Sequence, residues 1–142
     1  MEKEIKKEVV DIADFFTTTR SKEGIWYEPK VDGIGIGIEF KIFGPASDKA
    51  VLALDEYLKE HEKAKSEADE KTAVEIERNA LASRAAAVVG GVRAKGGKAI
   101  VCNKKDFKGS KDEIRTVMYE NEDICVDLIT AASRNATFMR KR

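Results

Sequence analysis

Ile34-Gly-Ile-Gly-Ile-Glu-Phe-Lys-Ile42 constrains the fold of this 142-residue chain more than any other stretch. Its apolar residues recur at every second position, which is typical of a β-strand with one apolar face. Ile25-Trp26-Tyr27 predicts a second strand, and Asp32-Gly33 between the two is a turn signal. Residues 25–43 therefore predict an antiparallel hairpin near the N-terminus.

Three glycines alternate with the isoleucines of this stretch, at Gly33, Gly35 and Gly37. Their spacing matches neither the G-x-G-x-x-G fingerprint of dinucleotide-binding proteins nor a phosphate-binding loop. We interpret them as a bare strand face that lies close to another backbone.

Helical signals follow the hairpin. Gly44-Pro45 ends the strand, and Ser47 is a good N-cap for a helix with the stripe Val51, Leu54, Leu58 and His61. Residues 59–72 are almost entirely polar, which is typical of a solvated helix or a mobile connection. The apolar pattern resumes at residue 73, and the alanines of residues 80–87 allow close approach of another helix. We favour a core role for this face over an intermolecular seam, and we expect Gly90-Gly91 to end the helix.

The two ends of the chain are predicted to be helical as well. Residues 3–16 have apolar side chains at helical spacing, and we expect Thr17-Thr18-Thr19 to end that helix. Residues 98–102 predict a short strand. Ser110 and Glu113 form a capping-box pattern before a helix over residues 111–120, which Asn121 closes. Asp123 is expected to cap a last helix with one apolar face, and residues 138–142 are expected to fray. The apolar positions in these two terminal helices are Ile5, Val9, Ile12, Ala13 and Phe16, and Cys125, Leu128, Ile129, Ala132 and Ala136.

Together these patterns predict an α+β fold, a mainly α-helical single domain with an N-terminal β-hairpin. We divide it into residues 1–46 (helix and hairpin), 47–92 (a long charged helical segment, interrupted or continuous) and 93–142 (a short strand and two helices). The length fits one ordinary domain.

Charge is balanced overall and divided along the chain. The 26 basic and 26 acidic residues cancel. Residues 1–92 carry 14 basic and 19 acidic side chains, a net charge of −5, whereas residues 93–142 carry 12 and 7, a net charge of +5. Opposite poles favour head-to-tail self-association as much as an external partner. Zero net charge excludes the simplest nucleic-acid-binding or membrane-surface protein, and a charged N-terminus without an apolar span is expected for a cytoplasmic protein.

Residues that carry chemistry are few. Cys102 and Cys125 both have apolar neighbours and are expected to be buried thiols. With His61 they do not supply the four ligands of a zinc site. His61 is the single histidine, and we expect it to lack the partners that general-base catalysis requires. We therefore expect no enzyme, no catalytic residue, no metal and no cofactor.

Several strings resemble the tail assembly chaperones of long-tailed phages and prophages. Asp11-Ile-Ala-Asp-Phe-Phe16 with Glu23-Gly24 is similar to the opening of that family, and Phe40-Lys-Ile-Phe-Gly-Pro-Ala-Ser47 to its strand before the long helix. Val88-Val-Gly-Gly-Val92 is similar to its mid-chain segment, although the Trp often found after the glycine is absent. Ser133-Arg-Asn-Ala-Thr-Phe138 is similar to its end.

The resemblance implies a non-enzymatic chaperone, present in the bacterial cytoplasm and absent from the mature virion. It would coat the tape measure protein and help to recruit subunits of the major tail tube protein, the latter through a longer frameshifted form in many relatives. Arg140-Lys-Arg142 is compatible with such a frameshift. A homo-oligomer is also expected.

A helix-in-groove mode of binding would suit such a partner. We therefore hypothesise a partner or oligomer surface that is partly exposed in the monomer. It comprises Val74, Leu81, Val88, Leu128, Ile129 and Phe138.

Two other classes remain open. A structural tail or head-completion protein would have a similar size and would be found in purified particles. A small nucleic-acid-binding protein would use the basic C-terminal half, including Arg134 and Arg140–Arg142. Nucleic acid is disfavoured as a partner because bases and acids are interleaved and no helix has a continuous basic face.

Overall fold

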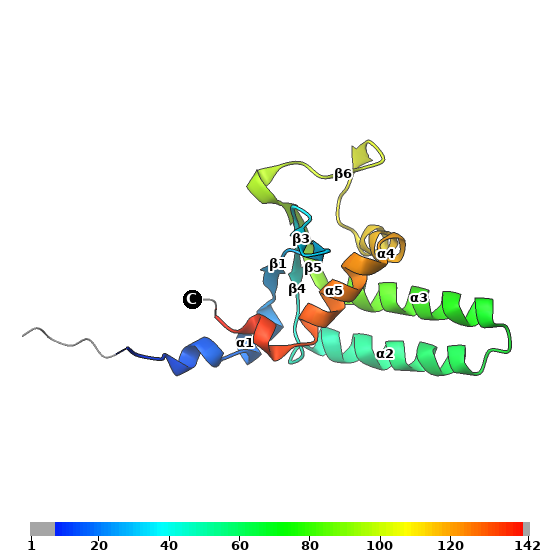
Figure 1. Ribbon diagram of the computed structural model, residues 1–142, viewed down its shortest axis with the longest axis horizontal. Coiled ribbons are helices and arrows are strands. Elements are labelled where there is room, and N and C mark those ends of the chain that lie inside the picture. Colours follow the sequence, from blue (N-terminus) through cyan, green and yellow to red (C-terminus); the bar gives the residue numbers. More distant parts are fainter. Residues whose placement is uncertain (1–7, 141–142) are drawn as a thin grey trace, which may run out of the picture.

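The computed structural model describes residues 8–140 (Figure 1). Helices dominate and the strands form three small sheets, so the α+β class with an N-terminal β-hairpin is confirmed. The α-helices are α1 (Thr18–Glu23), α2 (Asp48–Lys65), α3 (Glu70–Ala87), α4 (Lys111–Glu120) and α5 (Glu122–Ala132). The strands are β1 (Ile25–Tyr27), β2 (Lys30–Val31), β3 (Ile34–Gly35), β4 (Ile38–Ile42), β5 (Val89–Ala94), β6 (Val101–Cys102) and β7 (Lys105–Asp106). Short 3-10 helices are η1 (Ile12–Phe15), η2 (Lys95–Gly97) and η3 (Asn135–Phe138).

The predicted hairpin is the start of a three-stranded antiparallel sheet in the order β1-β4-β5. Ile25 pairs with Ile42, and β2 and β3 form a smaller hairpin beyond the main one, around the turn at Asp32-Gly33. The long alternating strand is interrupted between β3 and β4, because Gly37 has φ 79° and its N–H donates to the Glu28 carboxylate at 2.8 Å. Consequently Phe40 and Ile42 are buried, whereas Ile34 is exposed.

The predicted reason for the alternating glycines was wrong. At Gly35 the close neighbour is the side chain of Glu28, 2.5 Å from where a Cβ would lie, and not another backbone. Gly33 and Gly37 have positive φ and open space around them. These glycines therefore shape the turn and the break in the strand.

Strand β5 was not predicted. Gly90-Gly91 does follow the end of α3, but residues 89–94 continue as a strand that pairs with β4, with Phe40 opposite Val92. Both glycines lie under aromatic rings. A Cβ on Gly90 would lie 2.7 Å from the Phe43 ring, and one on Gly91 would lie 3.3 Å from Trp26. The Gly-Gly pair is therefore explained by packing as well as by helix termination.

Helices α2 and α3 form an antiparallel hairpin that projects from the rest of the molecule (Figure 1). The polar stretch 59–72 is helical as far as Lys65, and a connection over residues 66–69 leads to Asp69, which caps α3. The core role predicted for the Ala-rich face of α3 is confirmed, since Ala80, Ala82, Ala85 and Ala86 are buried.

The C-terminal helices agree with their local signals. Ser110 and Glu113 form the predicted capping box of α4, and Asn121 ends that helix. Helix α5 buries its apolar face against the rest of the core. Three details were wrong: α5 is preceded by Asn121 and is not capped by Asp123, Ala136 is exposed in η3, and Cys102 is exposed on the projecting β6–β7 hairpin.

The N-terminal helix predicted for residues 3–16 does not form over the described part of that range, and Ile5 lies outside the described residues. Asp11 caps the short η1, and α1 then runs through the threonines that were expected to end a helix. Tertiary contacts outweigh their low helix propensity, because Ser21 of α1 is fully buried and its hydroxyl accepts a bond from the Ala46 N–H at 2.8 Å.

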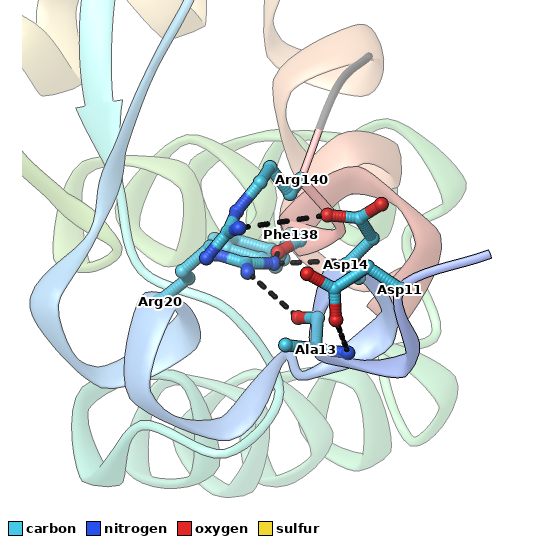
Figure 2. Close-up of polar contacts among 6 residues, drawn as sticks. All are labelled: Asp11, Ala13, Asp14, Arg20, Phe138 and Arg140. Carbon is cyan, nitrogen blue, oxygen red and sulfur yellow. Dashed lines mark hydrogen bonds and ion pairs between the residues drawn. The ribbon is translucent and has the colours of Figure 1, made fainter. Parts of the chain in front are cut away.

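The C-terminal segment is fixed as far as residue 140, so the prediction of a frayed tail was wrong for residues 138–140. Lys141 and Arg142 lie outside the described residues. Figure 2 shows a set of polar contacts that joins η1 to η3, which we call the terminal clasp. The Arg20 guanidinium donates to the carbonyl oxygens of Phe138 and Ala13 at 2.9 and 3.1 Å. The Arg140 N–H donates to the Asp14 carbonyl at 2.8 Å, and its guanidinium lies 3.6 Å from the Asp14 carboxylate.

Candidate functional site: an apolar groove beside α2

A groove of about 150 Å³ lies between the start of α2 and the end of α5, and we call it the apolar groove. Its floor consists of Val88, Ile129 and Ala132, all of which are buried. Val51 and Leu54 of α2 form one wall and are 57% and 40% exposed. The complete lining comprises Pro45, Ala50, Val51, Leu54, Arg84, Val88, Ile129, Ala132 and Ser133.

Large apolar side chains of α2 remain accessible along one face of the helix. Leu58 is 49% exposed and follows Val51 and Leu54 at helical spacing, and we call these three residues the α2 stripe. The stripe was predicted as part of the apolar face of this helix. The structure instead turns small residues toward the rest of the molecule, with Ala53 and Ala64 buried. Because alanines allow two helices to approach closely, α2 packs on α3 without covering the stripe.

A polar network lies beside the groove on the helical hairpin. The Arg84 guanidinium donates to the Ser133 hydroxyl at 3.3 Å and lies 5.4 Å from the Tyr57 ring centroid. The Tyr57 hydroxyl donates to the Glu77 carboxylate at 3.1 Å, and burial, followed by this hydrogen bond, raises the pKa of Tyr57. The network thus holds Arg84 at the rim of the groove.

The expectation that His61 lacks a partner was wrong. Its Nδ1 contacts the other Glu77 oxygen, and its ring stacks on Tyr57 with centroids 6.0 Å apart. Glu77 lies on the neighbouring helix, 16 positions further along the chain, so spacing along one helix could not have revealed the pair. Glu77 binds both His61 and Tyr57, and this arrangement joins α2 to α3.

The six residues predicted as a partner surface do not form one surface. Val88, Leu128, Ile129 and Phe138 are buried in the core, so the expectation that they are partly exposed does not hold. Val88 and Ile129 contribute only to the floor of the apolar groove. Val74 is 62% exposed and Leu81 is half-buried, and these two line a separate depression with Lys65, Glu70 and Glu122.

The sequence patterns identified the residues of the α2 stripe but did not show that these side chains form an exposed surface. The alanines at positions 50, 53 and 64 could have indicated this exposure. They lie on one face of α2, and that face includes the buried residues Ala53 and Ala64. Small residues at helical spacing indicate the face on which a second helix packs. The larger apolar residues of the same helix then lie on a different face.

Other reactive groups provide little chemistry. Burial raises the pKa of the Cys125 thiol to about 11, and its sulfur lies 3.6 Å from the Leu81 carbonyl oxygen. Over residues 8–140, His, Cys, Asp and Glu side chains form no group of three or more that could hold a metal ion. None of the helices described combines the length and apolar character that crossing a membrane requires.

No family model, curated protein or solved structure matches the chain. The resemblance to tail assembly chaperones therefore stays a prediction, and the geometry of the groove is the structural basis on which function can be argued.

Proposed function

We propose that the protein is a non-enzymatic phage tail assembly chaperone that binds an amphipathic helix of the tape measure protein. The observation that carries this proposal is the exposed α2 stripe beside the apolar groove. The similar sequence strings favour the same family.

The stripe and groove have the chemistry of a helix-binding surface. An amphipathic helix presents apolar side chains at i, i+3 or i+4 and i+7, and Val51, Leu54 and Leu58 offer a complementary row at the same spacing. The groove has room for an anchoring side chain, and Arg84 at its rim offers a donor for a carboxylate on the partner. Transient coverage of a helix requires no catalytic group.

The remaining partners follow from the same family role. Tail tube subunits would be recruited by a longer form of the chain, and several copies would associate along one tape measure molecule. The protein would act in the host cytoplasm and leave before the virion is complete.

The test is co-expression with the neighbouring tape measure gene, followed by size-exclusion chromatography with light scattering. The wild-type chain should yield a soluble complex with an otherwise insoluble tape measure protein. Leu54→Asp with Leu58→Asp should abolish the complex, because a buried, unpaired carboxylate is costly in an apolar interface.

Leu52→Asp is the matched control. Leu52 is 64% exposed and lies on the same helix outside the stripe and the groove lining. Far-ultraviolet circular dichroism of all variants should equal that of the wild type. Failure of the wild type to solubilise the tape measure protein would refute the function, whereas a complex that survives the double substitution would refute the groove as its binding surface.

A further inference from the structure

A lysine-rich arm projects from the sheet on the side away from the terminal clasp, between β5 and α4 (Figure 1). Residues 95–110 contain five lysines and a single acidic residue, Asp106. The arm ends in the β6–β7 hairpin, whose turn residues Asn103 and Lys104 have φ values of 51° and 69°. The positive charge of residues 93–142 is therefore concentrated on this arm rather than on a helix, with Lys104 and Lys105 in the β6–β7 hairpin itself.

The lysines of this arm fall into two groups. Lys95 lies at its base and pairs with Glu28 at 2.8 Å. Lys98, Lys104, Lys105 and Lys108 are exposed, and among the described residues none of them has a carboxylate within ion-pair distance. We call residues 98–108 the basic ribbon. Lys108 has the Glu113 carboxylate nearby, and after the hydrogen bonds from Ser110 its charge helps to lower the pKa of Glu113. Over residues 8–140 none of the four ammonium groups forms an ion pair, so they are available to an external anion.

The side chains of the ribbon favour a phosphate backbone over unpaired bases. Phe107 is its single aromatic residue, and this ring is half-buried against the core. Proteins that bind single strands stack bases on exposed aromatic rings, which the ribbon lacks. A two-stranded ribbon has the width to enter the major groove of a duplex, and lysines neutralise phosphates without reading sequence.

We infer that the basic ribbon binds the phosphate backbone of double-stranded nucleic acid without sequence specificity. This inference is independent of the proposed function, because it uses a different surface and a different ligand. The zero net charge of the whole chain does not oppose it, since the excess acid lies in residues 1–92.

The experiment measures binding of the full chain to a fluorescent DNA duplex of about 20 base pairs by anisotropy. If four lysines each displace a counterion, affinity should fall by about 100-fold between about 50 mM and about 200 mM salt. Replacing Lys98, Lys104 and Lys105 by Gln should weaken binding at the lower salt concentration by at least about tenfold and flatten the salt dependence to the slope of about one contact.

The control variant replaces Lys59, Lys63 and Lys65 of α2 by Gln, which changes the net charge equally at another exposed place. It should bind as the wild type does. Absence of binding at the lower salt concentration, or equal losses in both variants, would overturn the inference. A single strand of the same length that binds as tightly as the duplex would refute the duplex preference, and equal competition by poly-glutamate would point to an acidic protein instead.

Discussion

Replacing Arg20 by Met should loosen both ends of the described chain at once. The guanidinium makes two bonds within 3.1 Å, to the carbonyls of Phe138 and Ala13, and a weaker one of 3.4 Å to Asp14 (Figure 2). A hydrogen bond to a charged group contributes about 1.5–3 kcal/mol. Because Arg20 is only partly buried, water can replace part of each bond, so we expect the two short bonds to contribute about 3 kcal/mol together.

That loss corresponds to a decrease in melting temperature of about 10 °C for a domain of this size. Urea unfolding followed by far-ultraviolet circular dichroism measures the free energy, and hydrogen exchange of the Arg140 amide, which donates to Asp14, reports the clasp itself. Lys22→Met is the control, since Lys22 lies exposed on the same helix. Arg20→Lys should be intermediate, because an ammonium cannot reach all three carbonyls in the same planar arrangement. A loss below about 1 kcal/mol in Arg20→Met would refute the reasoning.

Three further predictions concern buried and capping groups. In the native protein at about pH 8, a thiol reagent should modify Cys102 and spare Cys125, whose pKa is raised to about 11 by burial; two reactive thiols before unfolding would contradict this. Phe138→Ala should cost about 3–5 kcal/mol in urea unfolding, because the ring is fully buried, and a near-neutral result would show that η3 is not part of the core. Hydrogen bonds lower the pKa of Glu113, and the bond from the Ser110 side chain has the largest effect. The stability that the ionised Glu113 contributes is therefore fully present above its unfolded pKa of roughly 4.3 and is lost as the pH falls through the lowered pKa of the folded state. Glu113→Gln should therefore lower the urea midpoint at neutral pH and match the wild type in acid, and a difference that persists in acid would argue against the capping role.

Sequence predicted the elements whose causes are local. The capping box of Ser110 and Glu113 lies within four residues, and Ser47 accepts a bond from the Lys49 N–H, so both helix starts could be located without knowledge of the fold. The β1–β4 pairing was also foreseen, because its two arms are close in sequence, although the Asp32-Gly33 turn directly closes the smaller β2–β3 hairpin between them.

Features that depend on distant contacts were missed. Strand β5 contains two adjacent glycines, which resemble a helix stop until Phe43 and Trp26 are seen to cover them. Helix α1 depends on the burial of Ser21, and the His61–Glu77 contact depends on how two helices align. None of these three features can be predicted from the order of residues along the chain alone.

The candidate surface failed for a related reason. Periodicity identifies an apolar face, but it does not say what covers that face. Leu128 and Phe138 have the same apolar character as Leu54, yet the fold buries the first two completely and leaves the third 40% exposed.

The placement of the helical hairpin has one more consequence. Strands β4 and β5 are neighbours in the sheet, although α2 and α3 lie between them in the chain. The two helices run antiparallel, so the chain returns to the sheet at the same place whatever their common length. Insertion of about seven residues, roughly two helical turns, on each side of the connection at residues 66–69 should lengthen the hairpin and leave the β4–β5 register unchanged. Evolution or design can therefore extend the projecting hairpin as a unit, with the rest of the domain serving as a constant base.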